Sequence, residues 1–189
     1  MLINSALNNN TNNKPSFKYW YRNVYHYPNM QKKVLYRNDT CFFRDEGLWC
    51  DVIDSLVKEF KDVSKINVRF YGSSNAEEIF TFLMRLIVSY PKEIVNKFTN
   101  VIARDIDPLT IEKARGFHTI SADEKRAINK YTNNNFDRFI SLNKLDESNG
   151  QPLYTISNEL HDKIDLGVAD IREDYKEFLN GFITDYYNK

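Results

Sequence analysis

The sequence predicts an α/β fold in which helices flank a parallel sheet. Three observations support it: short apolar segments alternate with longer segments of helical periodicity, glycine or proline marks several junctions, and the composition is that of a folded domain. Of the 189 residues, 42% are hydrophobic and 28% are charged, and the formal net charge is zero. This composition excludes a disordered chain, and the length suits one domain with a hydrophobic core.

The N-terminal part of the chain differs in composition from the rest. Residues 1–16 are polar and rich in asparagine, which predicts a flexible leader before a folded domain at 17–189. Residues 17–37 interleave aromatic and basic side chains, a pattern that can stack nucleobases. Because the chain has no excess positive charge to neutralise phosphates, we favour an irregular segment that covers the core and expect no nucleic-acid partner. Nucleic-acid binding by these residues is the weaker alternative.

The first elements of the domain are predicted to be a helix, a strand and a second helix. Residues 45–62 carry apolar side chains at helical spacing, with Asp45 as N-cap. Residues 66–72 are rich in β-forming side chains and end in glycine, which predicts a strand and a tight turn. Residues 73–75 offer capping side chains, and residues 76–90, apolar almost all round, predict a buried helix.

The next elements repeat this order. Residues 100–106 predict a second strand, and Asp107 is expected to cap a helix that begins at Pro108 and ends before Gly116. Alternating strands and helices indicate a βαβ unit and hence a parallel sheet. Residues 121–145 are expected to be helical and polar. Two further strands and a closing helix are expected over residues 153–156, 166–171 and 172–187.

Acidic residues follow the first two predicted strands, at the edge where parallel sheets bind ligands. Asp105 ends the second strand, and one carboxylate can accept hydrogen bonds from two neighbouring ribose hydroxyls. Glu77 and Glu78 follow the first strand, in a turn with one glycine, and would repel a pyrophosphate there. A positively charged nucleoside such as S-adenosylmethionine therefore fits better than a dinucleotide. The alternative is that these three acids only cap helices.

Other chemistries find little support in the sequence. Cys41 and Cys50 are too few for a four-ligand zinc site or a disulfide framework, and no histidine has metal-ligand spacing, so we expect no metal. His118 follows a helix end and is expected to have a packing role. Without a signal peptide or a run of about 18 apolar residues, we expect a cytoplasmic protein with reduced thiols and no membrane span.

Four segments, taken in order, resemble the CheR family of chemotaxis receptor glutamate methyltransferases, which use S-adenosylmethionine. Over residues 36–171 they are similar to the family's N-x-T-x-F-F-R segment, its S-T-G-E-E-P-Y-S turn, its A-T-D-I-D stretch with L-E-K-A-R-x-G, and a later pair of strands. The matching segments here are N-D-T-C-F-F-R (38–44), S-N-A-E-E-I-F-T (74–81), A-R-D-I-D (103–107) with I-E-K-A-R-G (111–116), and 154–171.

The resemblance implies a three-layer, Rossmann-like methyltransferase fold and a set of cofactor contacts. Glu77 or Glu78 would serve the methionine end of S-adenosylmethionine, and Asp105 would hold its ribose. Asp170 and Ile171 would lie along the adenine, with a carboxylate where the family has an amide. The implied cofactor-binding residues are Asn38, Thr40, Arg44, Glu77, Glu78, Asp105, Asp170 and Ile171.

The resemblance also implies a reaction, the methylation of glutamate carboxylates on a protein such as the cytoplasmic helix of a chemoreceptor. A carboxylate is already a nucleophile at neutral pH, so positioning and exclusion of water would carry catalysis. Arg44 would be catalytic by orienting the incoming carboxylate, since a guanidinium matches its geometry. The alternative for Arg44 is a surface cation beside Asp45 and Glu46.

Several departures from the family limit this expectation. Ala76 and Ile79 replace a glycine and a proline in the turn, and a side chain at 76 is expected to crowd the ligand. The family's N-terminal helical domain, its F-C-R-N-V-x-I-Y-F strand and its receptor-docking β-subdomain are expected to be missing. We therefore expect an incomplete sheet with an exposed edge that a partner or a second copy covers. The alternative function is a non-catalytic module that binds cofactor or protein, or a truncated remnant.

Overall fold

The computed structural model describes residues 22–25, 34–37, 40–44 and 46–171, in two compact units that divide after Arg37. In the first unit, β1 (Arg22–Tyr25) pairs antiparallel with β2 (Val34–Arg37). This hairpin corrects the expectation of an irregular segment, and its valine, leucine and tyrosine residues have high β-propensity. The expected leader and closing helix lie outside the described residues, as does the expected cap Asp45.

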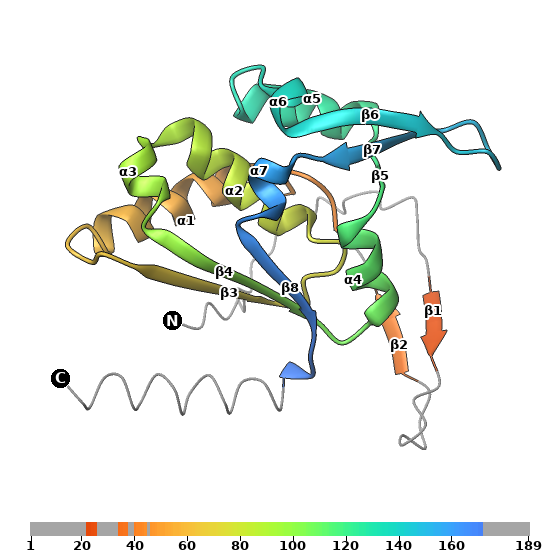
Figure 1. Cartoon of the computed structure of the whole chain (residues 1–189), viewed down its shortest axis with the longest axis horizontal. Helices are drawn as coiled ribbons and strands as arrows, with labels where there is room; N and C mark the ends of the chain where they lie inside the picture. The colour runs from red at the N-terminus through yellow and green to blue at the C-terminus, as the bar shows by residue number, and fades with distance from the viewer. Residues whose placement is uncertain (1–21, 26–33, 38–39, 45, 172–189) are drawn as a thin grey trace, which may run out of the picture. The chain divides into compact units, whose positions relative to one another are not determined.

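The second unit is built around a three-stranded parallel sheet. Its strand order is β3-β4-β8, and β4 pairs in parallel with both neighbours (Figure 1). The α/β class and the parallel sheet predicted from the sequence are thereby confirmed. In the part of the chain that the structure describes, β3 pairs only with β4. The strands are β3 (Ile66–Tyr71), β4 (Phe98–Asp105) and β8 (Ile164–Val168).

Helices connect these strands much as the sequence predicts. Asp107 caps α4 as expected: its carboxylate accepts the Leu109 N–H at 3.0 Å and the Thr110 hydroxyl at 2.8 Å, and Gly116 lies just past the end. No helix among the described residues combines the length and apolarity needed to cross a membrane. The helices of this half are α1 (Glu46–Glu59), α2 (Glu77–Ser89), α3 (Lys92–Val95) and α4 (Pro108–Arg115).

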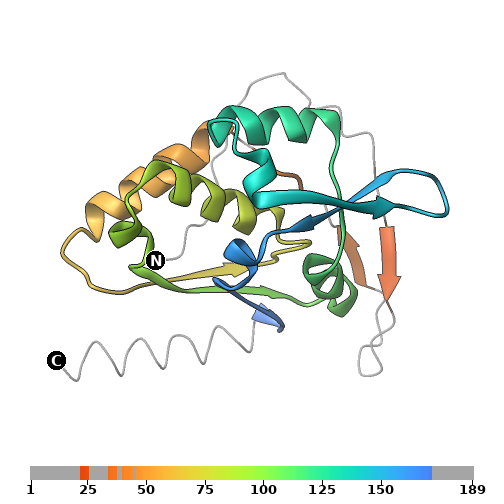
Figure 2. The ribbon, with the colours of Figure 1, turned by 45° about the horizontal axis from the view of Figure 1, so that its top comes forward.

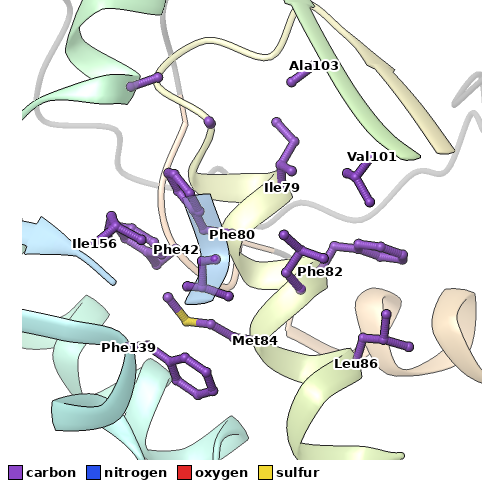
Figure 3. Packing of buried hydrophobic residues seen from close by; sticks show 14 of the residues in the cluster. Phe42, Ile79, Phe80, Phe82, Met84, Leu86, Val101, Ala103, Phe139 and Ile156 are labelled. Atoms are coloured by element: carbon purple, nitrogen blue, oxygen red, sulfur yellow. The ribbon is translucent and has the colours of Figure 1, made fainter. Parts of the chain in front are cut away.

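The hydrophobic core centres on α2, which is buried as predicted. Phe82 packs edge-on against Trp49 of α1, Phe70 of β3 and Phe98 of β4. Phe80, on the other side of the helix, packs against aromatic rings from other segments of the chain. Figure 3 shows this packing, with Ile79, Phe80, Phe82, Met84 and Leu86 of α2 close to Val101 and Ala103 of β4 and to Phe42, Phe139 and Ile156.

Along β3, core side chains alternate with polar ones, and of the consecutive buried residues Val101, Ile102 and Ala103 on β4 only Ile102 lies outside the core cluster. On β3, Val68 and Phe70 pack against the core, while the intervening positions carry Asn67 and Arg69. This alternation is typical of a sheet with one apolar face, whereas parallel strands buried on both faces read as continuous apolar runs. The structure therefore supports a core on one face, and the third layer of the expected fold stays a prediction.

Arg104 on β4 ties two strands together on the polar side of the sheet. Its guanidinium donates to the Asp165 carboxylate and to the Asp165 carbonyl, both at 2.7 Å, and the hydrogen bond from Arg104 lowers the pKa of Asp165. Gly167 makes room for this side chain, since a Cβ there would lie 3.0 Å from Arg104 Nη1. A side chain at position 167 would therefore need the Arg104 guanidinium to shift by a few tenths of an ångström.

Replacing Gly167 with alanine is expected to lower the free energy of unfolding by about 1 kcal/mol, because the shift of Arg104 that a Cβ demands weakens its hydrogen bonds to Asp165. Urea unfolding followed by circular dichroism measures this change. Gly47→Ala is the matched control, since a Cβ at that helical position meets nothing within 4 Å and alanine favours helix. Equal or greater stability of the Gly167 variant would contradict the prediction.

A second, antiparallel sheet lies within the connection between α4 and β8, with strand order β5-β7-β6 (Figure 2). The strand expected over residues 153–156 is confirmed as its central strand, but the sheet itself was not expected. We expected residues 121–145 to be helical throughout, and this is wrong for the second half, where a strand begins at Ile140. The elements are β5 (His118–Thr119), α5 (Ala122–Tyr131), α6 (Phe136–Phe139), β6 (Ile140–Leu145), β7 (Pro152–Ile156) and α7 (Asn158–His161).

The β6–β7 hairpin owes its form to the turn that joins its strands. Gly150 has a φ of +69°, which a residue with a side chain adopts only with strain. Its N–H donates to the Asp146 carbonyl at 2.7 Å, and the Asp146 N–H donates to the Gln151 carbonyl at 2.7 Å. This turn chemistry, and not the periodicity of residues 121–145, specifies the strand.

Candidate functional site

The candidate site is the turn between β3 and α2, together with the end of β4. Gly72 has a φ of +66°, and Ser74 and Ala76 have φ of +48° and +67°. Left-handed backbone costs about 1–2 kcal/mol for residues with a Cβ, and such strain concentrates at functional sites. Ala76 is the N-cap of α2 and makes no side-chain cap, so the expected capping by residues 73–75 is wrong. Its methyl group lies in the core, which also corrects the expectation that it crowds the ligand.

Asp105 holds this turn in place. One carboxylate oxygen, Oδ2, accepts the Ser74 N–H at 2.8 Å, and the other, Oδ1, accepts the Asp107 N–H at 2.9 Å. These bonds fix the backbone of the turn at Ser74 and join it to the start of the segment that follows β4. Each oxygen keeps a second lone pair, so Asp105 can still accept a hydrogen bond from a ligand hydroxyl. The predicted ribose residue therefore has a structural role that the sequence did not reveal.

Buried polar atoms without a hydrogen-bond partner gather at the turn and in the segment before α1. Such atoms are uncommon in folded proteins, because burying one costs roughly 1–3 kcal/mol. Polar groups of a ligand would satisfy them. Among the described residues they include Thr40 Oγ1, Ser73 Oγ, Ser74 Oγ, Asn75 Oδ1 and Glu77 Oε2.

Residues 40–44 lie beside the first turns of α2. The Phe43 N–H donates to the Thr81 hydroxyl at 2.9 Å, and Arg44 Nη1 lies 3.9 Å from Glu78 Oε1. The structure thus brings the T-x-F-F-R segment to the glutamate-bearing turn, as the resemblance implies. Asn38, the remaining predicted residue of this segment, lies outside the described residues.

Cys41 lies in the same segment and is not a reactive thiol. Its pKa is raised to about 11, chiefly by burial and also by Glu124 and the two glutamates of the turn, while Arg44 acts in the opposite direction. A cysteine nucleophile needs a lowered pKa, so that the thiolate forms at neutral pH. This environment favours a neutral thiol.

The two glutamates of the turn have different surroundings. Glu77 has a side chain only 10% exposed, and its Oε1 lies 3.9 Å from His118 Nδ1. Glu78 is 40% exposed and lies near Arg44. A buried carboxylate needs a compensating positive group more than an exposed one does. Glu77 is therefore the better candidate to bind a cationic part of a ligand, a choice that the sequence left open.

His118 reaches the candidate site from β5. It has the packing role expected from the sequence, with ring centroids 6.1 Å from Phe42 and 5.7 Å from Phe80. It also faces Glu77, which the sequence analysis missed. Only the pairing of His118 with Tyr154 on β7 fixes this position, and no local pattern signals it.

The end of β8 lies next to the end of β4. Val168 pairs with Asp105, and the Ala169 N–H donates to the Asp105 carbonyl at 2.9 Å. The half-buried Asp170 and the exposed Ile171 follow directly. The structure therefore brings both predicted adenine residues to the same edge of the sheet as Asp105.

His161 of α7 lies beside Phe80 and is expected to make the stability of the fold sensitive to acid. Its ring packs edge-on against Phe80 at 5.2 Å, and burial lowers its pKa below the ordinary value, with His118 lowering it further. In the unfolded chain this histidine binds a proton near pH 6.5, whereas in the folded chain it does so only at lower pH. Its contribution to stability is therefore fully present above pH 6.5 and is lost as the pH falls below that value.

Replacing His161 with phenylalanine is expected to reduce the loss of stability between pH 7 and pH 5, because the variant keeps the ring and removes the titrating group. Urea unfolding of both proteins at pH 7.5, 6.0 and 5.0 measures the difference. If the two proteins lose the same free energy of unfolding on acidification, the prediction is wrong.

Within the described residues, no cluster of three or more histidine, cysteine or acidic side chains is arranged to hold a metal ion, and Cys41 and Cys50 form no disulfide bond. No protein-family model matches this chain, and no curated protein sequence matches it either.

Proposed function

We propose that this chain binds S-adenosylmethionine at the turn between β3 and α2. The observation that carries the proposal is the buried Glu77, which keeps an unpartnered Oε2 beside a strained turn anchored by Asp105. A ligand for this place needs a cationic group for the carboxylate and hydroxyl groups for Asp105. S-adenosylmethionine has an ammonium group, a sulfonium and a ribose.

The charge of the turn supports this ligand over a nucleotide. Glu77 and Glu78 both lie in the first turn of α2, where a dinucleotide-binding helix would receive the pyrophosphate. Their carboxylates favour cations and oppose phosphates. A Rossmann-like methyltransferase fold is part of the same proposal, with Thr40 and Arg44 ordering the site and with Asp170 and Ile171 along the adenine.

We further propose a reaction of the CheR type, in which a protein glutamate carboxylate is methylated. The bound cofactor would supply the electrophilic methyl group. Arg44 is 37% exposed and lies 3.9 Å from Glu78, so its guanidinium is accessible to a second carboxylate from a substrate. Bidentate binding by arginine would orient that carboxylate, and positioning is the main requirement because the nucleophile is already ionised.

A protein substrate, such as a chemoreceptor's cytoplasmic helix, and a place in the cytoplasm follow from this proposal. We also propose that a partner or a second copy covers an exposed edge of the incomplete sheet; in the described residues β3 pairs only with β4 and so leaves one such edge. Gel filtration tests it: a well-behaved monomer would count against pairing at that edge.

Isothermal titration calorimetry with S-adenosylmethionine and S-adenosylhomocysteine tests the binding proposal. We expect both to bind the full chain, and absence of heat with millimolar ligand would overturn it. Transfer is tested with radiolabelled cofactor and a glutamate-rich helical protein, where a base-labile methyl ester is the expected product. Binding without such a product would indicate the non-catalytic module instead.

A further inference from the structure

Glu77 and His118 form a buried pair of titratable side chains at the candidate site. Their side chains are 10% and 2% exposed, and His118 Nδ1 lies 3.9 Å from Glu77 Oε1. The second ring nitrogen of His118, Nε2, lies 3.4 Å from the Ala114 carbonyl oxygen. Both ring nitrogens therefore face oxygen atoms that can only accept hydrogen bonds when Glu77 is ionised.

The protonation state of the ring decides how many of these acceptors it can serve. A neutral imidazole carries one N–H, which can be directed to Ala114 or to Glu77 but not to both. An imidazolium carries two and also supplies the positive charge that a buried carboxylate needs. Of the two forms, only the doubly protonated ring offers an N–H to each of these oxygen atoms.

A cationic ligand would favour the neutral form of the His118 ring, because it would compete with the imidazolium for the Glu77 carboxylate. Glu77 Oε2 is buried and has no hydrogen-bond partner, so it is the oxygen that can receive an ammonium group. The ligand cation and the imidazolium would then both contact the Glu77 carboxylate. Because this place is shielded from water, the two positive charges would repel each other strongly. Loss of the Nδ1 proton from His118 removes the repulsion.

We infer that His118 is a positioning residue that, through Glu77, couples the binding of an ammonium-bearing cofactor to the release of one proton. The inference rests on the proposed function, since it concerns the same site and ligand. It predicts that cofactor affinity increases with pH, by up to about tenfold per pH unit.

Other titratable and charged groups surround the pair and contribute to the pH profile. His161 of α7 interacts electrostatically with His118, and the neighbours of Glu77 include Cys41, whose raised pKa keeps it neutral. The experiment must therefore distinguish protons released by these groups from the proton released by His118. Among the described residues, the groups on the packed elements include Cys41, Arg44, Glu77, Glu78, Glu124, Tyr154, His161 and Asp162.

Calorimetric titration of the full chain with S-adenosylhomocysteine, in buffers of different ionisation enthalpy at pH 6.5, tests the inference. The dependence of the observed heat on the buffer gives the number of protons released. We expect the wild type to release more protons than His118→Gln, and its affinity to rise more steeply between pH 5.5 and 7.5. The ligand's own amino group titrates alike in both proteins, so the difference belongs to His118.

His161→Phe is the matched control, since it removes the neighbouring histidine and should retain the proton release. His118→Asn serves as a second variant if the glutamine variant does not fold, as judged by circular dichroism. Equal proton release in the wild type and the His118 variant that folds would overturn the inference and leave the proposed function standing. Absence of binding to the wild type would overturn both.

Discussion

Replacing Glu77 with glutamine should weaken the binding of S-adenosylmethionine by roughly 30- to 150-fold. The carboxylate is buried and its Oε2 has no protein partner, so a ligand ammonium is expected to form its strongest charged contact there. Loss of one partner of such a buried charge pair costs about 2–3 kcal/mol. Calorimetry at pH 7.5 measures the change in dissociation constant directly.

Glu78→Gln provides a matched control for this result. The two residues are adjacent in the first turn of α2, so both substitutions remove one charge from the same helix end. Because Glu78 is exposed and lies near Arg44, we expect its substitution to change affinity by less than about threefold. A larger loss from Glu78 than from Glu77 would show that the methionine end is bound elsewhere.

Replacing Asp105 with alanine should have the largest effect on stability at the site, a loss of about 2–4 kcal/mol. The substitution leaves the backbone N–H groups of Ser74 and Asp107 without their acceptor in a buried place. Urea unfolding measures the loss. Asp107→Ala is the comparison, since removal of that helix cap should cost only about 1 kcal/mol.

The structural role of Asp105 also determines how its ligand role must be tested. Any substitution of this residue disturbs the turn, so loss of binding in the variant would not by itself identify a ribose contact. Removing the hydroxyls from the ligand avoids this problem. A 2′,3′-dideoxy analogue of S-adenosylhomocysteine should bind the wild type more weakly than the parent compound, and equal affinity would refute the ribose assignment.

Elements whose side chains carry a strong local pattern could be predicted from the sequence. The alternation of β3, the continuous apolar character of α2 and the Asp107–Pro108 start of α4 each depend on neighbouring residues alone. The same holds for Asp105, which a strand end brings to the ligand-binding edge of a parallel sheet. These features gave the class of fold and the location of the candidate site.

Features that depend on distant partners could not be predicted. The strand that begins at Ile140 forms because the following turn lets β7 pair with it. A polar segment of this kind has no strand signature of its own. The meeting of His118 with Glu77 requires the antiparallel sheet, and the left-handed backbone of Ala76 requires the anchoring of the turn by Asp105. In each case a tertiary contact overrides local propensity.

The antiparallel sheet inserted between α4 and β8 bears on how the protein reaches its native state. Val101 of β4 must find Ile164 of β8 across the whole of this insert, and pairing over such sequence separation is entropically costly and slow. A locally folded β6–β7 hairpin that also pairs with β5 brings His118 close to Tyr154 and so shortens the loop left to close. We therefore expect the parallel sheet to gain its third strand fastest when the antiparallel sheet has already formed.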